Sequence, residues 1–146
     1  RTLKQIEGVS SYSGRDGLTE MLNKTDYLVN ILPLTDETLN LLNTETLSQL
    51  KRGAYFINVG RGQTLVEEDL IPLLDAGQLS GACLDVFRTE PLAEGHPFRK
   101  HKKILITPHN SCSTPPEAVA PQIYENYKRA ISGRQLLNLV DLKHGY

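Results

Sequence analysis

The sequence contains few cysteines, no long apolar run and no excess of either charge. Its two cysteines, Cys83 and Cys112, provide no disulfide framework, so we expect a reducing, cytoplasmic compartment. The apolar runs reach only about five residues, which is too short for a membrane span or a secretory leader. Because 16 basic residues nearly balance 17 acidic ones, we expect no nucleic-acid partner and no membrane partner.

The common metal and phosphate motifs are absent as well. The sequence contains no CxxC, no HExxH, no acidic spacing typical of metal ligands, no P-loop and no GxGxxG. We therefore expect no metal site, and the candidates for chemistry are single residues that a fold would bring together.

Short apolar runs rich in strand-forming residues alternate with helical patterns along the chain. The runs occupy residues 27–32, 54–59, 82–86 and 104–107. They are apolar almost throughout rather than alternating, which is typical of parallel strands covered on both faces. We therefore predict an α/β fold, with a parallel Rossmann-type sheet and crossover helices.

Two prolines constrain the predicted helices. If the third helix has residue 67 or 68 as its N-cap, Pro72 lies near the fourth helical position, where a missing N–H is tolerated. Gly77 then follows as its C-terminal cap. For the last helix we predict a start near Pro121 and an end at Gly133.

Four polar residues lie at or near the predicted carboxyl ends of the strands, where parallel sheets bind ligands. Arg61, between two glycines, presents a planar fork that suits a carboxylate. His109 is suited to proton transfer, and Glu90 can orient such an acid or base. Asp85 lies inside an apolar run, where a carboxylate needs a hydrogen-bond partner. Structural roles stay open: a surface turn for Arg61, a solvated loop for Glu90 and a satisfied buried carboxylate for Asp85.

Four stretches together resemble the D-isomer-specific 2-hydroxyacid dehydrogenases. They are NILPLTDET (30–38), LKRGAYFINVGRGQTLVEEDL (50–70), GACLDVFRTEPL (81–92) and ITPHNS (106–111). The family order of Arg, Glu and His is kept by Arg61, Glu90 and His109, which are 29 and 19 positions apart. Within the family, VSSYSGRDGL near the start and NLVDLKHGY at the end are most similar to bacterial type A glyoxylate/hydroxypyruvate reductases.

The resemblance implies a role for each of the four polar residues. Arg61 would bind the carboxylate and the carbonyl oxygen of the substrate. His109 would be the general acid in reduction and the base in oxidation, with Glu90 pairing to it and holding it protonated. Asp85 would meet the nicotinamide carboxamide.

The resemblance also implies a set of cofactor contacts along the same edge. Arg1 and Thr2 are candidates for holding a 2′-phosphate, so we favour NADP, with NAD as the alternative. Three apolar residues would lie along the adenosine, Thr38 would reach a ribose or phosphate, and backbone would line the nicotinamide. The expected cofactor-binding residues are Arg1, Thr2, Leu32, Pro33, Leu34, Thr38, Asn58, Val59, Gly60, Arg61, Asp85 and His109.

The family has two domains and is longer than this chain, which begins at Arg1 without Met. We expect residues 1–120 to form an incomplete nucleotide-binding domain that lacks the first strand and the glycine-rich turn. Residues 121–146 would form a C-terminal helix and tail that return to a substrate domain. On this interpretation the 146 residues alone are an inactive fragment.

The function implied is hydride transfer from NAD(P)H to a small 2-oxoacid, such as glyoxylate or hydroxypyruvate, to give the 2-hydroxyacid. The full-length protein would be a homodimer. Another small 2-hydroxyacid or phosphoglycerate remains open as the substrate. The alternative of a different class is a non-catalytic, dinucleotide-sensing protein on the same fold.

Overall fold

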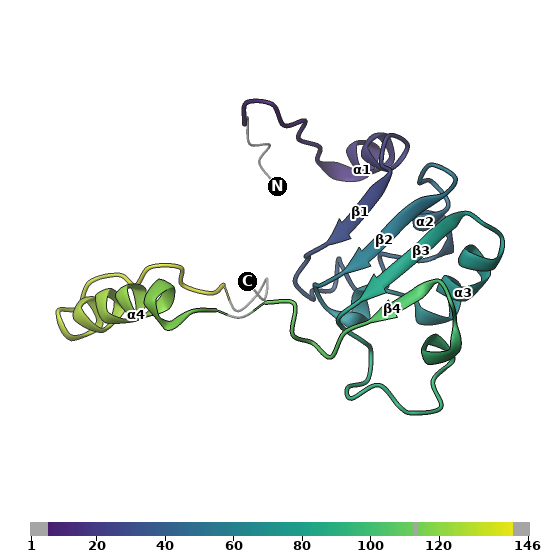
Figure 1. The fold of residues 1–146 in the computed structure, drawn as a ribbon. Coiled ribbons are helices and arrows are strands. Elements are labelled where there is room, and N and C mark those ends of the chain that lie inside the picture. The colour runs from purple at the N-terminus through teal and green to yellow at the C-terminus, as the bar shows by residue number, and fades with distance from the viewer. Residues whose placement is uncertain (1–5, 113, 142–146) are drawn as a thin grey trace. The chain divides into compact units, whose positions relative to one another are not determined.

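A computed structural model describes residues 6–112 and 114–141 of the chain (Figure 1). The chain divides into two compact units, with the boundary between His109 and Asn110. The two units are described separately below. In the described part of the chain, no helix combines the length and the apolarity that crossing a bilayer requires.

The first unit is built on a four-stranded sheet in the order β1-β2-β3-β4, with every neighbouring pair parallel (Figure 1). The strands are β1 (Tyr27–Asn30), β2 (Ala54–Asn58), β3 (Leu79–Leu84) and β4 (Ile104–Ile106). Asn30 pairs with Asn58, Asn58 with Leu84, and Leu84 with Ile106. All four carboxyl ends therefore meet at one edge, as the predicted parallel sheet requires.

One short helix precedes β1, and other short helices and turns connect the strands. They are α1 (Gly14–Leu22), α2 (Thr44–Leu47) and α3 (Glu67–Asp75), with 3-10 turns η1 (Gly62–Thr64) and η2 (Pro97–Lys100). α2 is a single turn of four residues. It begins where the side chain of Asn43 accepts a hydrogen bond from the Thr46 N–H at 3.0 Å, which caps the helix.

One face of the sheet carries the core. Leu28, Phe56 and Ala82 are neighbours in register and pack with buried leucines of the helices, such as Leu47 and Leu70. The next row of the sheet differs. Val29 and Leu105 are exposed and Ile57 and Cys83 half-buried, so within the described residues of the first unit the helices cover one face of the sheet and not both.

The predicted position of Pro72 is wrong. The N-cap of α3 is Val66, so Pro72 is the sixth residue of the helix rather than about the fourth. The helix continues to Asp75 because leucines on its inner side are buried in the core, which outweighs one missing N–H. Its predicted end is confirmed: Gly77, with φ of 69°, donates to Leu74 O at 3.2 Å.

The second unit contains α4 (Pro116–Ile131) and the segment that follows it. α4 begins at Pro116, five residues before the predicted start, and includes Pro121. Proline at the first helical position fits because that N–H has no partner within the helix. The predicted end is confirmed by Gly133, with φ of 65°, whose N–H donates to Ala130 O at 3.2 Å.

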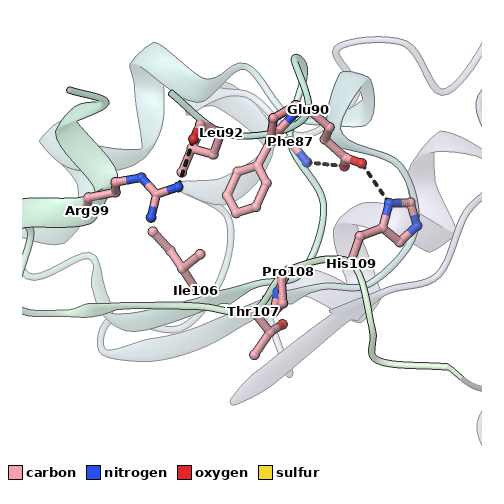
Figure 2. A pocket seen from close by; sticks show the side chains of 9 residues that line it. Phe87, Glu90, Leu92, Arg99, Ile106, Thr107, Pro108 and His109 are labelled. Carbon is pink, nitrogen blue, oxygen red and sulfur yellow. Dashed lines mark hydrogen bonds and ion pairs between the residues drawn. The ribbon is translucent and has the colours of Figure 1, made fainter. Parts of the chain in front are cut away.

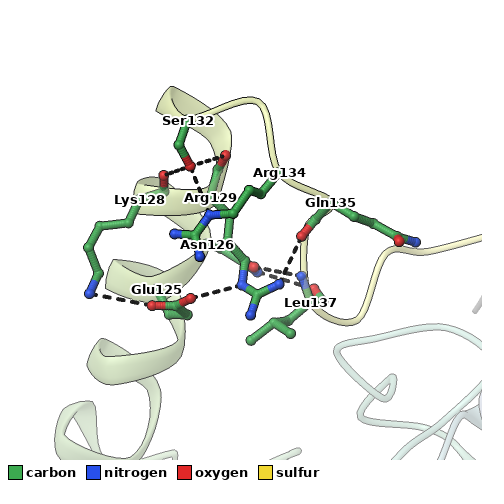
Figure 3. Close-up of polar contacts among 8 residues, drawn as sticks. All are labelled: Glu125, Asn126, Lys128, Arg129, Ser132, Arg134, Gln135 and Leu137. Atoms are coloured by element: carbon green, nitrogen blue, oxygen red, sulfur yellow. Dashed lines mark hydrogen bonds and ion pairs between the residues drawn. The ribbon is translucent and has the colours of Figure 1, made fainter.

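The segment after α4 folds back along the helix (Figure 3). The Asn126 side chain accepts from the Leu137 N–H at 2.7 Å and donates to Leu137 O at 3.2 Å. The Arg129 guanidinium donates to Gln135 O at 3.2 Å. The backbone groups of Gln135 and Leu137 lie outside any helix or strand, and these side chains of α4 provide their hydrogen-bond partners.

The turn after β2 touches the segment after β3 at the level of the backbone. A Cβ added to Gly62 would lie 1.9 Å from the carbonyl carbon of Phe87 and 2.5 Å from the Arg88 nitrogen. Both are far inside van der Waals contact, so only glycine fits unless one segment moves. Gly60, in the same turn, is also confined, because its Cβ would lie 2.8 Å from Leu32 O.

We expect Gly62→Ala to lower the free energy of unfolding by about 3 kcal/mol, the upper end of the usual cost of overpacking. The reason is that the added methyl group meets backbone atoms and not a side chain that can rotate away. Urea unfolding of the variant measures the loss. Gly95→Ala is the matched control, because its Cβ would have nothing within 4 Å. Equal stability of the two variants would contradict the close contact.

Candidate active site

The sheet brings together the three residues that the sequence singled out at strand ends. Arg61 follows β2, Glu90 follows β3 and His109 follows β4. All three line one cavity of about 170 Å³, together with Gly62, Gln63, Phe87 and Arg88. Residues far apart in sequence thus share one small concave space.

Glu90 and His109 form a directly bonded pair (Figure 2). His109 Nδ1 lies 2.7 Å from Glu90 Oε2, and Glu90 Oε1 accepts from the Phe87 N–H at 2.9 Å. The hydrogen bond from His109, followed by that from Phe87, lowers the pKa of the Glu90 carboxyl below its ordinary value of 4.5. Glu90 is therefore an acceptor at neutral pH, so the proton of the pair belongs on Nδ1. This leaves Nε2 as the ring atom available to exchange a proton.

The backbone of His109 has a conformation that few non-glycine residues adopt. Its φ is 52°, in the left-handed region. Such conformations cost free energy and are common at functional sites, where the surrounding structure holds them. Here the turn directs the imidazole towards Glu90 immediately after β4.

The backbone around Arg61 is held by a buried polar network. Asn30 Nδ2 donates to Asn58 Oδ1 and to Thr64 Oγ1, both at 2.8 Å. Asn58 Oδ1 also accepts from the Gly60 N–H at 3.2 Å, and Thr64 Oγ1 donates to Arg61 O at 2.6 Å. The three network side chains are buried, whereas Arg61 is exposed. The network therefore fixes the turn on both sides of Arg61 and leaves the guanidinium at the surface of the cavity.

Asp85 has a protein partner. It is 1% exposed, and the Thr107 hydroxyl donates a hydrogen bond to its carboxylate. Its own N–H donates to Asn58 O at 3.0 Å. The bond from Thr107 supports the structural role of Asp85 as a buried carboxylate with a hydrogen-bond partner. Contact between Asp85 and a nicotinamide stays a prediction.

The other expected cofactor contacts lie along the same edge of the sheet. Leu32, Pro33 and Leu34 follow β1 directly, with Pro33 and Leu34 exposed. Thr38 is buried, and its hydroxyl donates to Pro33 O at 2.7 Å and accepts from the Thr35 N–H at 2.8 Å. Thr38 thus shapes this loop, and its contact with a ribose or phosphate stays a prediction. Among the remaining expected contacts, Asn58 is the last residue of β2, and Val59 and Gly60 follow it in the turn. Arg1 and Thr2 lie outside the described residues.

A second cavity shares Phe87, Glu90 and His109 with the first, and Figure 2 shows the side chains that line it. It has a volume of about 540 Å³ and is walled mainly by apolar side chains, with Arg99 at its edge. Arg99 is held by bonds to Leu92 O at 2.7 Å and Ala93 O at 3.0 Å. Nowhere among residues 6–112 and 114–141 do three or more potential metal ligands of the His, Cys, Asp and Glu types gather.

Sequence reasoning missed Asn30, Thr64 and Arg88. Asn30 ends an apolar strand, and a polar side chain there was a signal in itself. Its partner Asn58, however, follows only from the parallel register. Thr64 belongs to the Arg61 turn, but nothing local in the sequence shows that its hydroxyl joins Asn30 to Arg61 O, and nothing local marks Arg88 as a neighbour of this turn.

We expect the stabilising effect of the Glu90–His109 pair to depend on pH. Because the pKa of Glu90 is lower in the folded protein, the pair stabilises the fold above the unfolded-state value of the pKa. The stabilisation is lost as the pH falls through the folded-state value. At neutral pH, Glu90→Gln should therefore lower stability, by less than about 1 kcal/mol because the pair is partly exposed. The difference from the unmodified protein should vanish in acid.

Thermal unfolding at a series of pH values measures this dependence. Glu94→Gln is the matched control, because it neutralises an exposed carboxylate in the same loop. A stability difference for Glu90→Gln that stays constant down to low pH would rule out the ionised pair as its cause.

Residues 1–111 match the family model described as D-isomer specific 2-hydroxyacid dehydrogenase, NAD binding domain. Over all 146 residues the chain is 43% identical to a glyoxylate/hydroxypyruvate reductase A of Yersinia enterocolitica and 44% identical to one of Photorhabdus laumondii. It covers 47% of each of these proteins, so it spans about half the length of the curated relatives it matches.

Two solved structures are similar along the whole chain. One is a D-isomer specific 2-hydroxyacid dehydrogenase from Xanthobacter autotrophicus in complex with NADPH and MES, with 44% identity, a TM-score of 0.95 and 60% of that chain covered. The other is an NADPH-dependent glyoxylate/hydroxypyruvate reductase from Sinorhizobium meliloti in complex with NADP and sulfate, with 38% identity, a TM-score of 0.92 and 48% covered. With a family model that spans 111 of its 146 residues and includes Arg61, Glu90 and His109, this chain belongs to the D-isomer specific 2-hydroxyacid dehydrogenase family.

Proposed function

We propose that the protein containing this chain reduces glyoxylate or hydroxypyruvate with NADPH, giving the 2-hydroxyacid. The observation that carries the proposal is the single cavity in which Arg61 meets the Glu90–His109 pair. An anion-binding fork and an oriented proton donor are the two groups that reduction of a 2-oxoacid requires. The names of the relatives from Yersinia enterocolitica and Sinorhizobium meliloti support the substrate and the cofactor.

Arg61 binds the substrate in this proposal. Arg61 is exposed and lines the cavity, and a guanidinium provides a planar, positively charged fork that matches a carboxylate. Two N–H groups of the fork bind the substrate carboxylate, and the positive charge stabilises the negative charge that develops on the carbonyl oxygen. The buried network below the turn keeps the fork in place.

His109 transfers the proton. The imidazolium form of His109 is the donor: its Nδ1–H is bonded to Glu90, with Nδ1 2.7 Å from Oε2, and its Nε2–H delivers a proton to the carbonyl oxygen as the hydride reaches C2, which leaves a neutral imidazole. In the oxidation direction Nε2 accepts the proton from the hydroxyl group. Glu90 keeps its orientation during either step because its other oxygen is bound to the Phe87 N–H.

The carboxyl edge of the sheet fits a dinucleotide. Exposed Pro33 and Leu34 offer apolar surface to an adenosine, and the turn at Gly60 lets a ligand approach the backbone. Asp85 and the backbone of residues 58–60 would hold the nicotinamide, which supplies the hydride when bound. Arg1 and Thr2 are proposed to favour the 2′-phosphate of NADP.

The wider organisation is part of the proposal. Residues 1–120 would form the larger part of a nucleotide-binding domain, and residues 121–146 would return to a substrate domain. The protein would act as a homodimer in the cytoplasm, without a nucleic-acid or membrane partner.

The test is NADPH oxidation by the protein containing this chain, with glyoxylate and hydroxypyruvate as substrates. We expect turnover with both, and Arg61→Lys should lower kcat/KM by about tenfold to a thousandfold, at about 1.4 kcal/mol per tenfold. Lysine keeps the charge but loses the fork. Arg52→Lys is the matched control, because Arg52 is exposed and bonds only to Ala76 O among the described partners.

His109→Gln should remove most activity in both directions, since glutamine has no titratable proton. A protein that binds NADPH but turns over neither oxoacid would be the dinucleotide-sensing alternative. An Arg61→Lys variant within about twofold of the unmodified enzyme would make Arg61 a turn residue only.

A further inference from the structure

Arg88 bridges the two halves of the candidate site. Its Nη1 donates to Leu65 O and to Asn40 Oδ1, both at 2.7 Å, and lies 3.5 Å from Gln63 O. In return, Gln63 Nε2 donates to Arg88 O at 3.3 Å. Arg88 belongs to the segment of Glu90, whereas Gln63 and Leu65 belong to the turn of Arg61. The two segments are therefore bonded in both directions.

The backbone of the Arg88 segment is itself anchored. The Arg88 N–H donates to Glu67 Oε1 at 2.9 Å, and the preceding N–H, that of Phe87, donates to Glu90 Oε1 at 2.9 Å. Glu67 is the first residue of α3, and its side chain is 13% exposed. Two consecutive peptide groups are thus held by two carboxylates. One carboxylate belongs to the helix and the other to the proton-transfer pair.

The same peptide lies against Gly62. A Cβ on Gly62 would collide with the Phe87 carbonyl and the Arg88 nitrogen, so the two segments meet without side chains between them. The close approach of Gly62 to the Phe87–Arg88 peptide fixes the distance between the two segments only if a further interaction holds the segments together. The Arg88 guanidinium, bonded to the far side of the Arg61 turn, supplies that connection.

We propose that Arg88 is a positioning residue that sets the place of Arg61 relative to the Glu90–His109 pair. The inference rests on the proposed function for its kinetic consequences. Arg88 acts through the backbone of the Arg61 turn, and the buried network of Asn30, Asn58 and Thr64 acts on the strand side of that turn. Without the Arg88 side chain, the turn loses the bonds at Gln63 O and Leu65 O that join it to the Glu90 segment, while the strand-side network and the backbone bonds to Asn40 and Leu42 remain. A displacement of about 1 Å of a substrate-binding group is enough to lower a rate by about a hundredfold.

Arg88 also lines the small cavity, so direct binding of the substrate is the competing role. The hydrogen bonds of Arg88 favour positioning, because Nη1 donates to two protein acceptors, both at 2.7 Å. A double-mutant cycle with Arg61→Lys separates the two roles. A residue that acts through Arg61 loses its effect once the Arg61 fork is gone, whereas an independent substrate ligand does not.

The kinetic experiment compares Arg88→Met, Arg88→Lys and the control Arg52→Met in the protein containing this chain. We expect Arg88→Met to lower kcat/KM for glyoxylate by about tenfold, with both a higher KM and a lower kcat, and Arg88→Lys to recover part of the loss. Arg52→Met removes a similar bond to a backbone carbonyl at Ala76, outside the site, and should stay within about twofold of the unmodified protein.

In the Arg61→Lys background, the further loss caused by Arg88→Met should shrink to within about twofold. A loss of the same size in both backgrounds would overturn the proposal and make Arg88 a substrate ligand. An Arg88→Met variant as active as Arg52→Met would overturn it as well.

Amide hydrogen exchange gives a second measurement that does not depend on activity. The Thr64 N–H donates to Arg61 O at 3.2 Å and the Leu65 N–H to Gly62 O at 3.0 Å, so both report on the turn. Both amides should exchange faster in Arg88→Met than in Arg52→Met. Equal exchange would overturn the positioning role. If the unmodified protein fails to reduce either oxoacid, the proposed function fails, and the exchange rates still decide the role of Arg88.

Discussion

The contact between Gly62 and the Phe87–Arg88 peptide is the constraint on which the candidate site depends. It joins the segments that follow two adjacent parallel strands, and each segment carries one half of the site. Because Gly62 has no side chain, direct contact between its backbone and the Phe87–Arg88 peptide sets the distance between the segments that carry Arg61 and Glu90. Backbone contacts have less freedom to adjust than contacts between flexible side chains, so the geometry they set is well defined.

The two halves of the site are supported by opposite kinds of interaction. The Arg61 turn is held by neutral amides and a hydroxyl that are buried at the ends of β1 and β2. The Glu90–His109 pair is partly exposed and charged on at least one side. A buried neutral network is unaffected by pH and keeps its shape, because each unpaired group would cost free energy. An exposed pair can exchange its proton with substrate or solvent, which a proton-transfer group has to do.

The sequence predicted the parts of the structure that depend on local pattern. The four apolar runs predict the four strands and their parallel direction. The meeting of Arg61, Glu90 and His109 follows because each residue comes after one of these runs. The helix ends at Gly77 and Gly133 followed from the conformational preference of glycine.

The missed features depend on contacts between distant segments. α4 begins before Pro121 and continues through it, and Pro72 lies two positions further into α3 than predicted, because the position of a helix is decided by more than the missing N–H of one residue. The Asn30–Asn58 pair exists only in the observed register. Arg88 bonds to Leu65 O, 23 residues earlier in the chain, and this contact follows only from the folded structure.

The charges around the small cavity match the proposed substrate. Arg61 and Arg88 bring two positive charges, and Glu90, whose lowered pKa keeps it ionised, brings one negative charge. With His109 protonated, as proton delivery from Nε2 requires, these side chains sum to +2, which favours an anionic 2-oxoacid over a neutral carbonyl compound. A neutral aldehyde or ketone would leave that charge uncompensated in a confined space. During reduction the carbonyl oxygen gains negative charge beside Arg61, so the attraction is stronger in the transition state than in the bound substrate. The same arrangement thus serves both the choice of an anionic substrate and the chemical step.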